Sequence, residues 1–305
     1  MIQSYVLLIL CVICWGSNFV FGSMLVHEFP PLLLSAFRLT ATSICLLSYA
    51  WGTRKLGKLS LRDWKLLVPL AIFGTLLNQT AFFTGLQTVD ATTASLILSL
   101  APLTIALLAR IFLKELITKQ MLVGSVIAIT GIFFVVGRSD GLQISIGMLY
   151  VFIAMFTFSV SVIIMRKLTE RMGAFTATVY STVIGSSLVI PVALIKEPLH
   201  QVSPHLWAWV LLFATGIVMQ GVCSVIWNIQ LTRVGAGKAS VFLNLQPFVA
   251  MLVGFLLLGT AVSIVQVVGA LLIVGGVVLA TLQRRVKIDG VGRTRAKPDS
   301  VNKLM

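Results

Sequence analysis

One arginine stands inside a long apolar stretch of the chain. Arg38 follows the run Pro31–Phe37 and is itself followed by mostly apolar residues as far as Trp51. A guanidinium stays charged and can only donate hydrogen bonds, so it must find oxygen acceptors in an apolar environment. Arg38 could meet the carboxylate of a bound ligand or form part of a gate. It could equally have a structural role, by binding main-chain carbonyls or by reaching the outer interface of a membrane.

Amide and aromatic side chains occur together in three other apolar stretches. Trp15 and Asn18 are three residues apart, so a helix would place them on one face. A pocket that is mostly apolar with a few directed polar groups would use such a combination, and the rings could also hold a cation. The alternative is that the amides join helices by hydrogen bonds while the rings face lipid. The two other stretches contribute the candidate residues Asn78, Gln79 and Phe82, and Gln220, Trp227 and Asn228.

Two prolines, Pro102 and Pro247, interrupt apolar stretches at matching places. Each removes a main-chain hydrogen bond from a helix and therefore predicts a kink. A mechanical role in bending is one interpretation. The other is a binding site that uses the freed carbonyls, which are tolerated at membrane depth only where they face protein or a wet cavity. The polar residues one or two turns away that could complete such a site are Ser95, Ser99, Asn244 and Gln246.

The elements that must position these residues are membrane-spanning helices. The chain is 58% hydrophobic and 10% charged, whereas a soluble domain is about 25% charged. Apolar runs of roughly 20 residues, the length that crosses a bilayer as a helix, recur from end to end without the alternation of a β-barrel. We therefore predict an all-α membrane protein with ten spans, at residues 5–26, 31–51, 66–86, 91–112, 119–137, 146–165, 176–195, 207–231, 236–258 and 263–283.

The basic residues predict the orientation of these spans. Of the 23 lysines and arginines, 20 lie in the C-terminal tail and in every second connection between spans, and only Arg138 and Lys196 lie in the other connections. Short basic loops stay in the cytoplasm, so both termini are predicted to be cytoplasmic, with residues 284–305 as a disordered tail. The net charge of +14 is thus a topology signal, and we expect no nucleic acid as a partner.

The two halves of the chain repeat one pattern. A shift of 145 positions superimposes residues in 89–102 and 123–131 on identical residues in 234–247 and 268–276, among them Pro102 on Pro247. Each half contains five spans, and because five is odd the second half enters the membrane from the opposite side. We therefore predict two inverted five-helix repeats, at residues 5–138 and 145–283. Secondary transporters often have this design, with the substrate site near the midplane between the repeats.

In the order of its motifs and in its internal duplication, the chain resembles the EamA-type transporters of the drug/metabolite transporter superfamily. The resemblance covers about residues 5–283 and implies a ten-helix carrier of small metabolites, often an exporter of amino acids or related compounds. The family usually has a glutamate after the ninth span, where this chain has Thr260. The segments that carry the resemblance, in order, are Trp15–Phe19, Ala36–Arg38, Ala91–Ser95 with Ala101–Pro102, Lys114–Glu115, Gly237–Ser240 and Gln246–Pro247.

Several function classes find no support in the residues. No carboxylate lies near the middle of any predicted span, as a proton relay would usually require, and there is no phosphate-binding loop of an ATP-driven pump. Residue types for a metal site, a cofactor or an enzyme active site do not cluster. A channel stays open as the main alternative to a carrier, and a membrane enzyme or a receptor is less favoured. We expect a small-molecule substrate, the lipid bilayer as surroundings, and the plasma membrane as location.

Two smaller features complete the predictions. Gly124 and Ala128 in the fifth span, and Gly269 and Gly276 in the tenth, are small residues that favour close helix contact. That contact could lie within the chain or form the face of a homodimer. At the cytoplasmic end of the fourth span, Lys114 and Glu115 are expected to form an interfacial charge pair.

Overall fold

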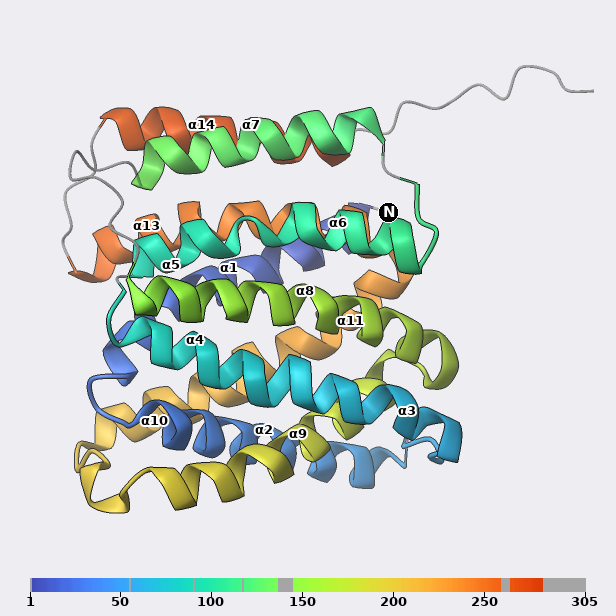
Figure 1. Cartoon of the computed structure of the whole chain (residues 1–305), viewed down its shortest axis with the longest axis vertical. Helices are drawn as coiled ribbons and strands as arrows, with labels where there is room; N and C mark the ends of the chain where they lie inside the picture. Colours follow the sequence, from blue (N-terminus) through green and yellow to red (C-terminus); the bar gives the residue numbers. More distant parts are fainter. Residues whose placement is uncertain are drawn as a thin grey trace, which may run out of the picture.

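The computed structural model describes residues 2–54, 56–89, 91–116, 118–136, 145–258 and 264–281, where every regular element is a helix (Figure 1). The first half contains α1 (Ile2–Leu25), α2 (Pro31–Thr53), α3 (Leu61–Leu70), the π-helix η1 (Ala71–Leu77), α4 (Asn78–Leu86), α5 (Ala91–Leu98), α6 (Ala101–Phe112) and α7 (Lys119–Val136). The second half contains α8 (Ile146–Met172), α9 (Ala174–Lys196), the 3-10 helix η2 (Leu199–Gln201), α10 (Leu206–Ala214), the π-helix η3 (Thr215–Val222), α11 (Cys223–Val234), α12 (Ala236–Val241), the 3-10 helix η4 (Phe242–Leu245), α13 (Gln246–Leu258) and α14 (Ile264–Thr281).

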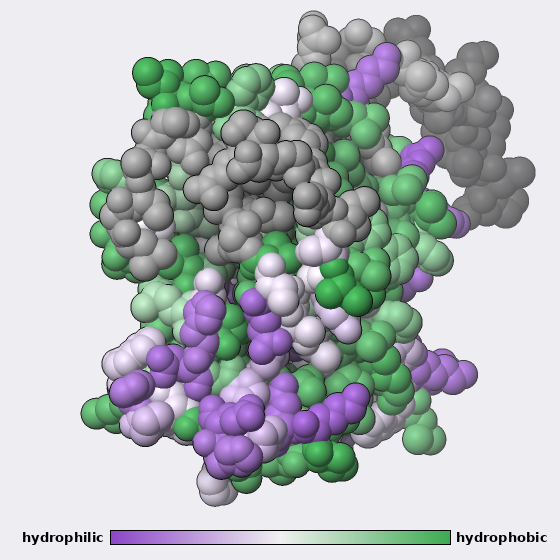
Figure 2. Space-filling model, turned by 60° about the vertical axis from the view of Figure 1, so that its left-hand side comes forward, coloured by the Kyte–Doolittle hydropathy of each residue, from purple (hydrophilic) through white to green (hydrophobic). Residues whose placement is uncertain are grey.

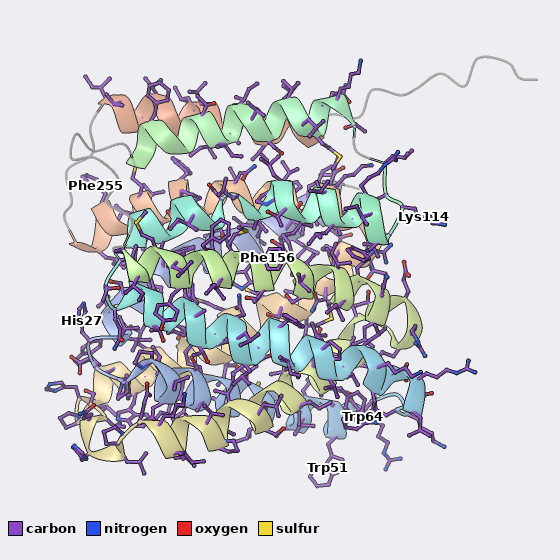
Figure 3. All side chains as sticks on the ribbon, viewed as in Figure 1. His27, Trp51, Trp64, Lys114, Phe156 and Phe255 are labelled. Carbon is purple, nitrogen blue, oxygen red and sulfur yellow. The ribbon has the colours of Figure 1, made fainter. Side chains whose placement is uncertain are left out.

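Within the part of the chain that the structure describes, seven continuous helical segments are long and apolar enough to cross a membrane, and two further apolar helices are shorter. The chain is therefore an all-helical, multi-pass membrane protein. Thr260 and the tail 284–305 lie outside the described residues. Figure 3 places His27 and Lys114 at opposite ends of the bundle. It also places Trp51 and Trp64 on the Lys114 side of the bundle, and both side chains are exposed, as aromatic side chains often are at a membrane interface.

The two halves contact each other through equivalent pairs of helices. α4 packs against α8 and α11 packs against α1, while α6 contacts α8 and α13 contacts α1. Likewise η1 lies against α9 and η3 lies against α2. The pairs α2–α9 and α7–α14 join elements at equivalent positions, and in Figure 1 they lie toward opposite edges of the molecule. Ser43 of α2 and Ser186 of α9 meet with their hydroxyl oxygens 3.0 Å apart.

Equivalent helices are also interrupted at equivalent places. The π-helix η1 separates α3 from α4, and η3 separates α10 from α11. In the next helices, α5 ends at Leu98 and α6 begins at Ala101, directly before Pro102, while η4 ends directly before Gln246 and Pro247. Pro102 therefore stands in the first turn of a new helix, where the missing main-chain N–H costs no hydrogen bond, whereas Pro247 stands where the 3-10 helix η4 continues into α13.

The pair α7–α14 is packed through its glycines. A Cβ atom on Gly131 would lie 2.5 Å from the carbonyl oxygen of Gly269, and one on Gly276 would lie 2.5 Å from that of Gly124. Such distances are below any normal van der Waals contact, so only glycine permits this approach. The small residues thus meet within one chain. A homodimer stays a prediction, and it would have to use other faces of these two helices.

Two glutamates cap helices that belong to the opposite half. Glu197, at the end of α9, accepts hydrogen bonds from the main-chain N–H groups of Leu32 (3.1 Å) and Leu33 (2.8 Å) in α2. Glu115, after α6, accepts them from Ala236 and Gly237 in α12, both at 3.0 Å. The predicted pair of Glu115 with Lys114 is therefore wrong: the carboxylate meets a helix N-terminus, and its nearest cation is Arg166 at 3.9 Å. A positive helix end with free N–H donors attracts a carboxylate more effectively than an exposed lysine does.

Candidate functional site

A cavity of about 220 Å³ lies between the two halves. Its wall is formed by α1, the α3–η1–α4 segment, α8, α9 and the η3–α11 segment, with single residues from α2, α5, α6, η4 and α13. Both π-helices border it, η1 through Gly74 and Thr75 and η3 through Gln220. π-Helical turns within α-helices are frequent at functional sites. The cavity is smaller than the roughly 300–1,000 Å³ pockets of drug-sized ligands, so it suits a small solute.

The wall of the cavity is polar but uncharged. Among the described residues that line it there is no aspartate, glutamate, lysine, arginine or histidine. Six carry amides (Asn18, Asn78, Gln79, Gln220, Asn228, Gln246) and six carry hydroxyls (Thr75, Ser161, Thr178, Ser181, Thr182, Ser224), while five are aromatic (Trp15, Phe19, Phe82, Phe158, Trp227). Such a surface can exchange hydrogen bonds with a polar solute and can pack against its apolar part.

Most of the residues predicted from the sequence reach this wall. Those that line it are Trp15, Asn18, Asn78, Gln79, Phe82, Gln220, Trp227, Asn228 and Gln246. Ser95, Ser99 and Asn244 are buried beside the proline interruptions and are not among the lining residues. Arg38 also lies off the wall, directly behind Asn18.

The hydroxyl residues of α8 and α9 were not predicted. Serine and threonine in apolar helices usually bond to the carbonyl one turn earlier, and Ser161 does so with Phe158 at 2.7 Å. A hydroxyl in an apolar helix therefore gives little indication of which way that helix faces. The signal that could have found Ser161 is its place in the repeat, because a shift of 145 positions superimposes it on Gly16, next to Trp15.

The aromatic residues of the wall are held in fixed positions. The indole N–H of Trp15 donates to the main-chain oxygen of Met219 in η3 at 2.8 Å, and its ring lies 5.0 Å from that of Trp227. Phe19 and Phe82 meet edge to face at 5.7 Å. The shift of 145 positions superimposes Phe82 on Trp227, and both line the cavity, each beside an aromatic residue of α1.

Arg38 is a buried cation beside the cavity. Only 3% of its surface is exposed, and its Nη2 donates to the side-chain oxygen of Asn18 at 2.8 Å. Its guanidinium carbon lies 5.3 Å from the centre of the Phe83 ring. Its Nη1 has no hydrogen-bond partner among the described residues, and none of their carboxylates forms an ion pair with it. Burying a charge without an ion pair costs free energy, and charged residues inside a membrane protein usually mark a functional site.

Comparison with known proteins identifies the family. The model of the EamA-like transporter family matches the chain twice, over residues 2–137 and 145–282. The chain belongs to this family. As an EamA-like protein it is a membrane transporter, and its relatives bear names of the same kind. The uncharacterized transporter YyaM of Bacillus subtilis (strain 168) is 28% identical over 92% of this chain and 94% of its own length.

Two other comparisons concern a named relative of this EamA-like transporter and a solved structure with the same fold. The probable terminal-alkyne amino-acid exporter of Streptantibioticus cattleyicolor is 26% identical, over 94% of this chain and 97% of its own. A solved crystal structure with 20% sequence identity superimposes with a TM-score of 0.79, covering 92% of this chain and 98% of the other. The EamA-like chain thus shares its fold with an experimentally determined structure.

Proposed function

We propose that this protein is a secondary transporter that exports small amphiphilic metabolites, such as amino acids or related compounds, by alternating access. In this proposal ten spans form two inverted five-helix repeats, at residues 5–138 and 145–283, in the plasma membrane with both termini in the cytoplasm. The two matches of the family model and the reciprocal helix contacts support the repeats. Figure 2, which brings the His27 end of the bundle forward, shows hydrophilic side chains gathered there and largely hydrophobic flanks.

The observation that carries the proposal is the position of the cavity. Residues from both halves line it, with α1 and α4 from the first and α8 and α11 from the second. A site between repeats can open to either side as one repeat rocks against the other. The uncharged wall favours a solute whose own charges are absent or balanced. The name of the Streptantibioticus relative supports export of an amino-acid-like compound.

The test is transport by the purified protein in liposomes, with a pool of labelled amino acids and related metabolites. We expect saturable flux of one or a few compounds. The variant Gln79→Leu should raise the half-saturating concentration about tenfold. Its amide lines the cavity and makes no side-chain hydrogen bond within the described chain, so it is free to bond the solute, and such a bond contributes roughly 1 kcal/mol.

Gln120→Leu is the matched control. Gln120 stands at the start of α7, away from the cavity, and its replacement should leave transport unchanged. Flux that rises linearly with concentration would instead identify a channel. A folded protein that moves nothing in a broad pool would contradict the transport proposal.

A further inference from the structure

A second hollow lies on the surface of the bundle, at the end of α2. Its volume is about 550 Å³, and the described residues that line it differ from those of the cavity between the halves. We call this hollow the α2 groove. It is lined by Leu47, Ser48, Ala50, Trp51, Arg54 and Leu56. These residues belong to the last turns of α2 and to the connection that follows, so the α2 groove stands apart from the transport cavity.

The α2 groove is apolar at one end and charged at the other. Leu47, Trp51 and Arg54 follow one another at spacings of four and three residues, so they form a stripe along one face of the helix. At 1.5 Å per residue this stripe is about 10 Å long. The side chain of Leu47 is 39% exposed and that of Trp51 is 87% exposed, and Figure 3 shows Trp51 at the edge of the bundle. The groove therefore faces the surroundings of the protein.

The polar groups of the α2 groove are hydrogen-bond donors without a protein partner. The guanidinium of Arg54 and the indole N–H of Trp51 can only donate, and neither has an acceptor or an ion pair among the described residues. The hydroxyl of Ser48 makes no hydrogen bond there either, whereas Thr53 of the same helix donates to the main-chain oxygen of Tyr49 at 2.8 Å. The groove therefore suits a ligand that brings acceptor oxygens.

The charge around the groove favours an anion. Residues 54–62, which follow α2, include Arg54 and Lys58 and contain no aspartate or glutamate. The next carboxylate along the chain, that of Asp63, is already engaged, because it caps the start of α3 and pairs with Arg171 at 3.0 Å. The positive charge at the end of α2 is thus left for a group from outside the chain, and basic residues beside a membrane attract anionic headgroups.

We propose that the α2 groove binds one anionic glycerophospholipid of the surrounding membrane. The phosphate lies at Arg54 and the indole N–H of Trp51, which are neighbours on adjacent turns of the helix. Ser48 donates to an ester carbonyl, which lies deeper in a bilayer than the phosphate, and an acyl chain lies along Leu47. A free phosphate ion would leave the apolar end of the groove empty, and a purely apolar molecule would leave its donors unpaired.

The experiment measures lipid binding to the purified, delipidated protein in detergent by native mass spectrometry. The protein is titrated with phosphatidylglycerol and with phosphatidylcholine that carries the same acyl chains. We expect the first phosphatidylglycerol to bind about tenfold more tightly, because its net charge matches the groove. Equal affinities would overturn the inference. Inorganic phosphate should not displace the bound lipid, and displacement by equal concentrations of it would assign the groove to a free anion.

Two variants and a control separate the groove from general attraction between charges. Arg54→Gln should weaken phosphatidylglycerol binding about tenfold and leave phosphatidylcholine binding unchanged, whereas Leu47→Asn should weaken the binding of both lipids. Both positions are exposed, so the unfolding midpoint without lipid should stay that of the wild type. Arg233→Gln is the control, because Arg233 is exposed at the end of α11 and does not line the groove. Equal losses in Arg54→Gln and Arg233→Gln would overturn the inference.

Discussion

Replacing Gly276 by valine is expected to separate α14 from α7 and to lower the unfolding midpoint of the detergent-solubilised protein. The added Cβ would lie 2.5 Å from the Gly124 carbonyl oxygen and 2.6 Å from the Ala128 main-chain nitrogen. Both are main-chain atoms that cannot turn aside, so the helices must move apart and lose the contacts that hold them together. Overpacking of this kind costs about 1–3 kcal/mol, which corresponds to roughly 2–4 °C per kcal/mol in domains of 150–250 residues.

The neighbouring glycine is the matched control. A Cβ on Gly275 meets nothing within 4 Å, so Gly275→Val should leave the midpoint almost unchanged. Thermal unfolding of both variants, followed by fluorescence-detected gel filtration, gives the comparison. Equal midpoints for the two variants would mean that α7 and α14 do not pack through their glycines. The reciprocal change Gly131→Val should behave like Gly276→Val, because its Cβ meets Gly269 in the same way.

Replacing Glu115 by alanine is expected to free the start of α12 and to weaken the contact between the halves at the Lys114 end of the bundle. The carboxylate accepts two main-chain hydrogen bonds at 3.0 Å and stands at the positive end of a helix. Together these interactions stabilise the folded protein by about 2 kcal/mol. Glu115→Gln has one acceptor oxygen in place of two and no charge, so its loss should be intermediate.

Glu170→Ala is the control for this series. Glu170 pairs with Arg166 across one helical turn and its side chain is 55% exposed, so its removal should cost little. We expect unfolding midpoints in the order wild type and Glu170→Ala, then Glu115→Gln, then Glu115→Ala. An alanine variant as stable as the wild type would show that the cap on α12 contributes nothing to stability.

The helices themselves were predictable from the sequence. A helix occupies each of the ten predicted stretches, within the described residues, because an apolar run in a bilayer must satisfy its own main-chain hydrogen bonds. The helix in the third stretch begins earlier than its apolar residues predict. Apolarity begins near residue 66, whereas α3 begins at Leu61, because Ser60 and Asp63 form a capping box that starts the helix in the polar loop.

Part of the candidate site was predictable for a related reason. An amide in an apolar helix cannot face lipid cheaply, so Asn18, Asn78 and Gln79 had to turn inward. Apart from Arg38, the predicted residues that miss the cavity are Ser95, Ser99 and Asn244, and these were chosen by distance along the chain from a proline. Ser99 stands at the break between α5 and α6, and Asn244 stands in the 3-10 helix η4. A change of helix type alters the rotation per residue, so regular α-helical spacing points these side chains in the wrong direction.

The sequence by itself determined that this protein is helical, lies in a membrane and repeats one pattern in its two halves, because these properties follow from composition and periodicity along one chain. Only the tertiary structure decided that Arg38 reaches Asn18, that Glu115 caps a helix of the other half, and that the amide of Asn78 donates to the main-chain oxygen of Ala154. These contacts depend on how one helix is rotated and shifted against another. Many weak contacts over the whole bundle set that rotation, and no local stretch of residues encodes it.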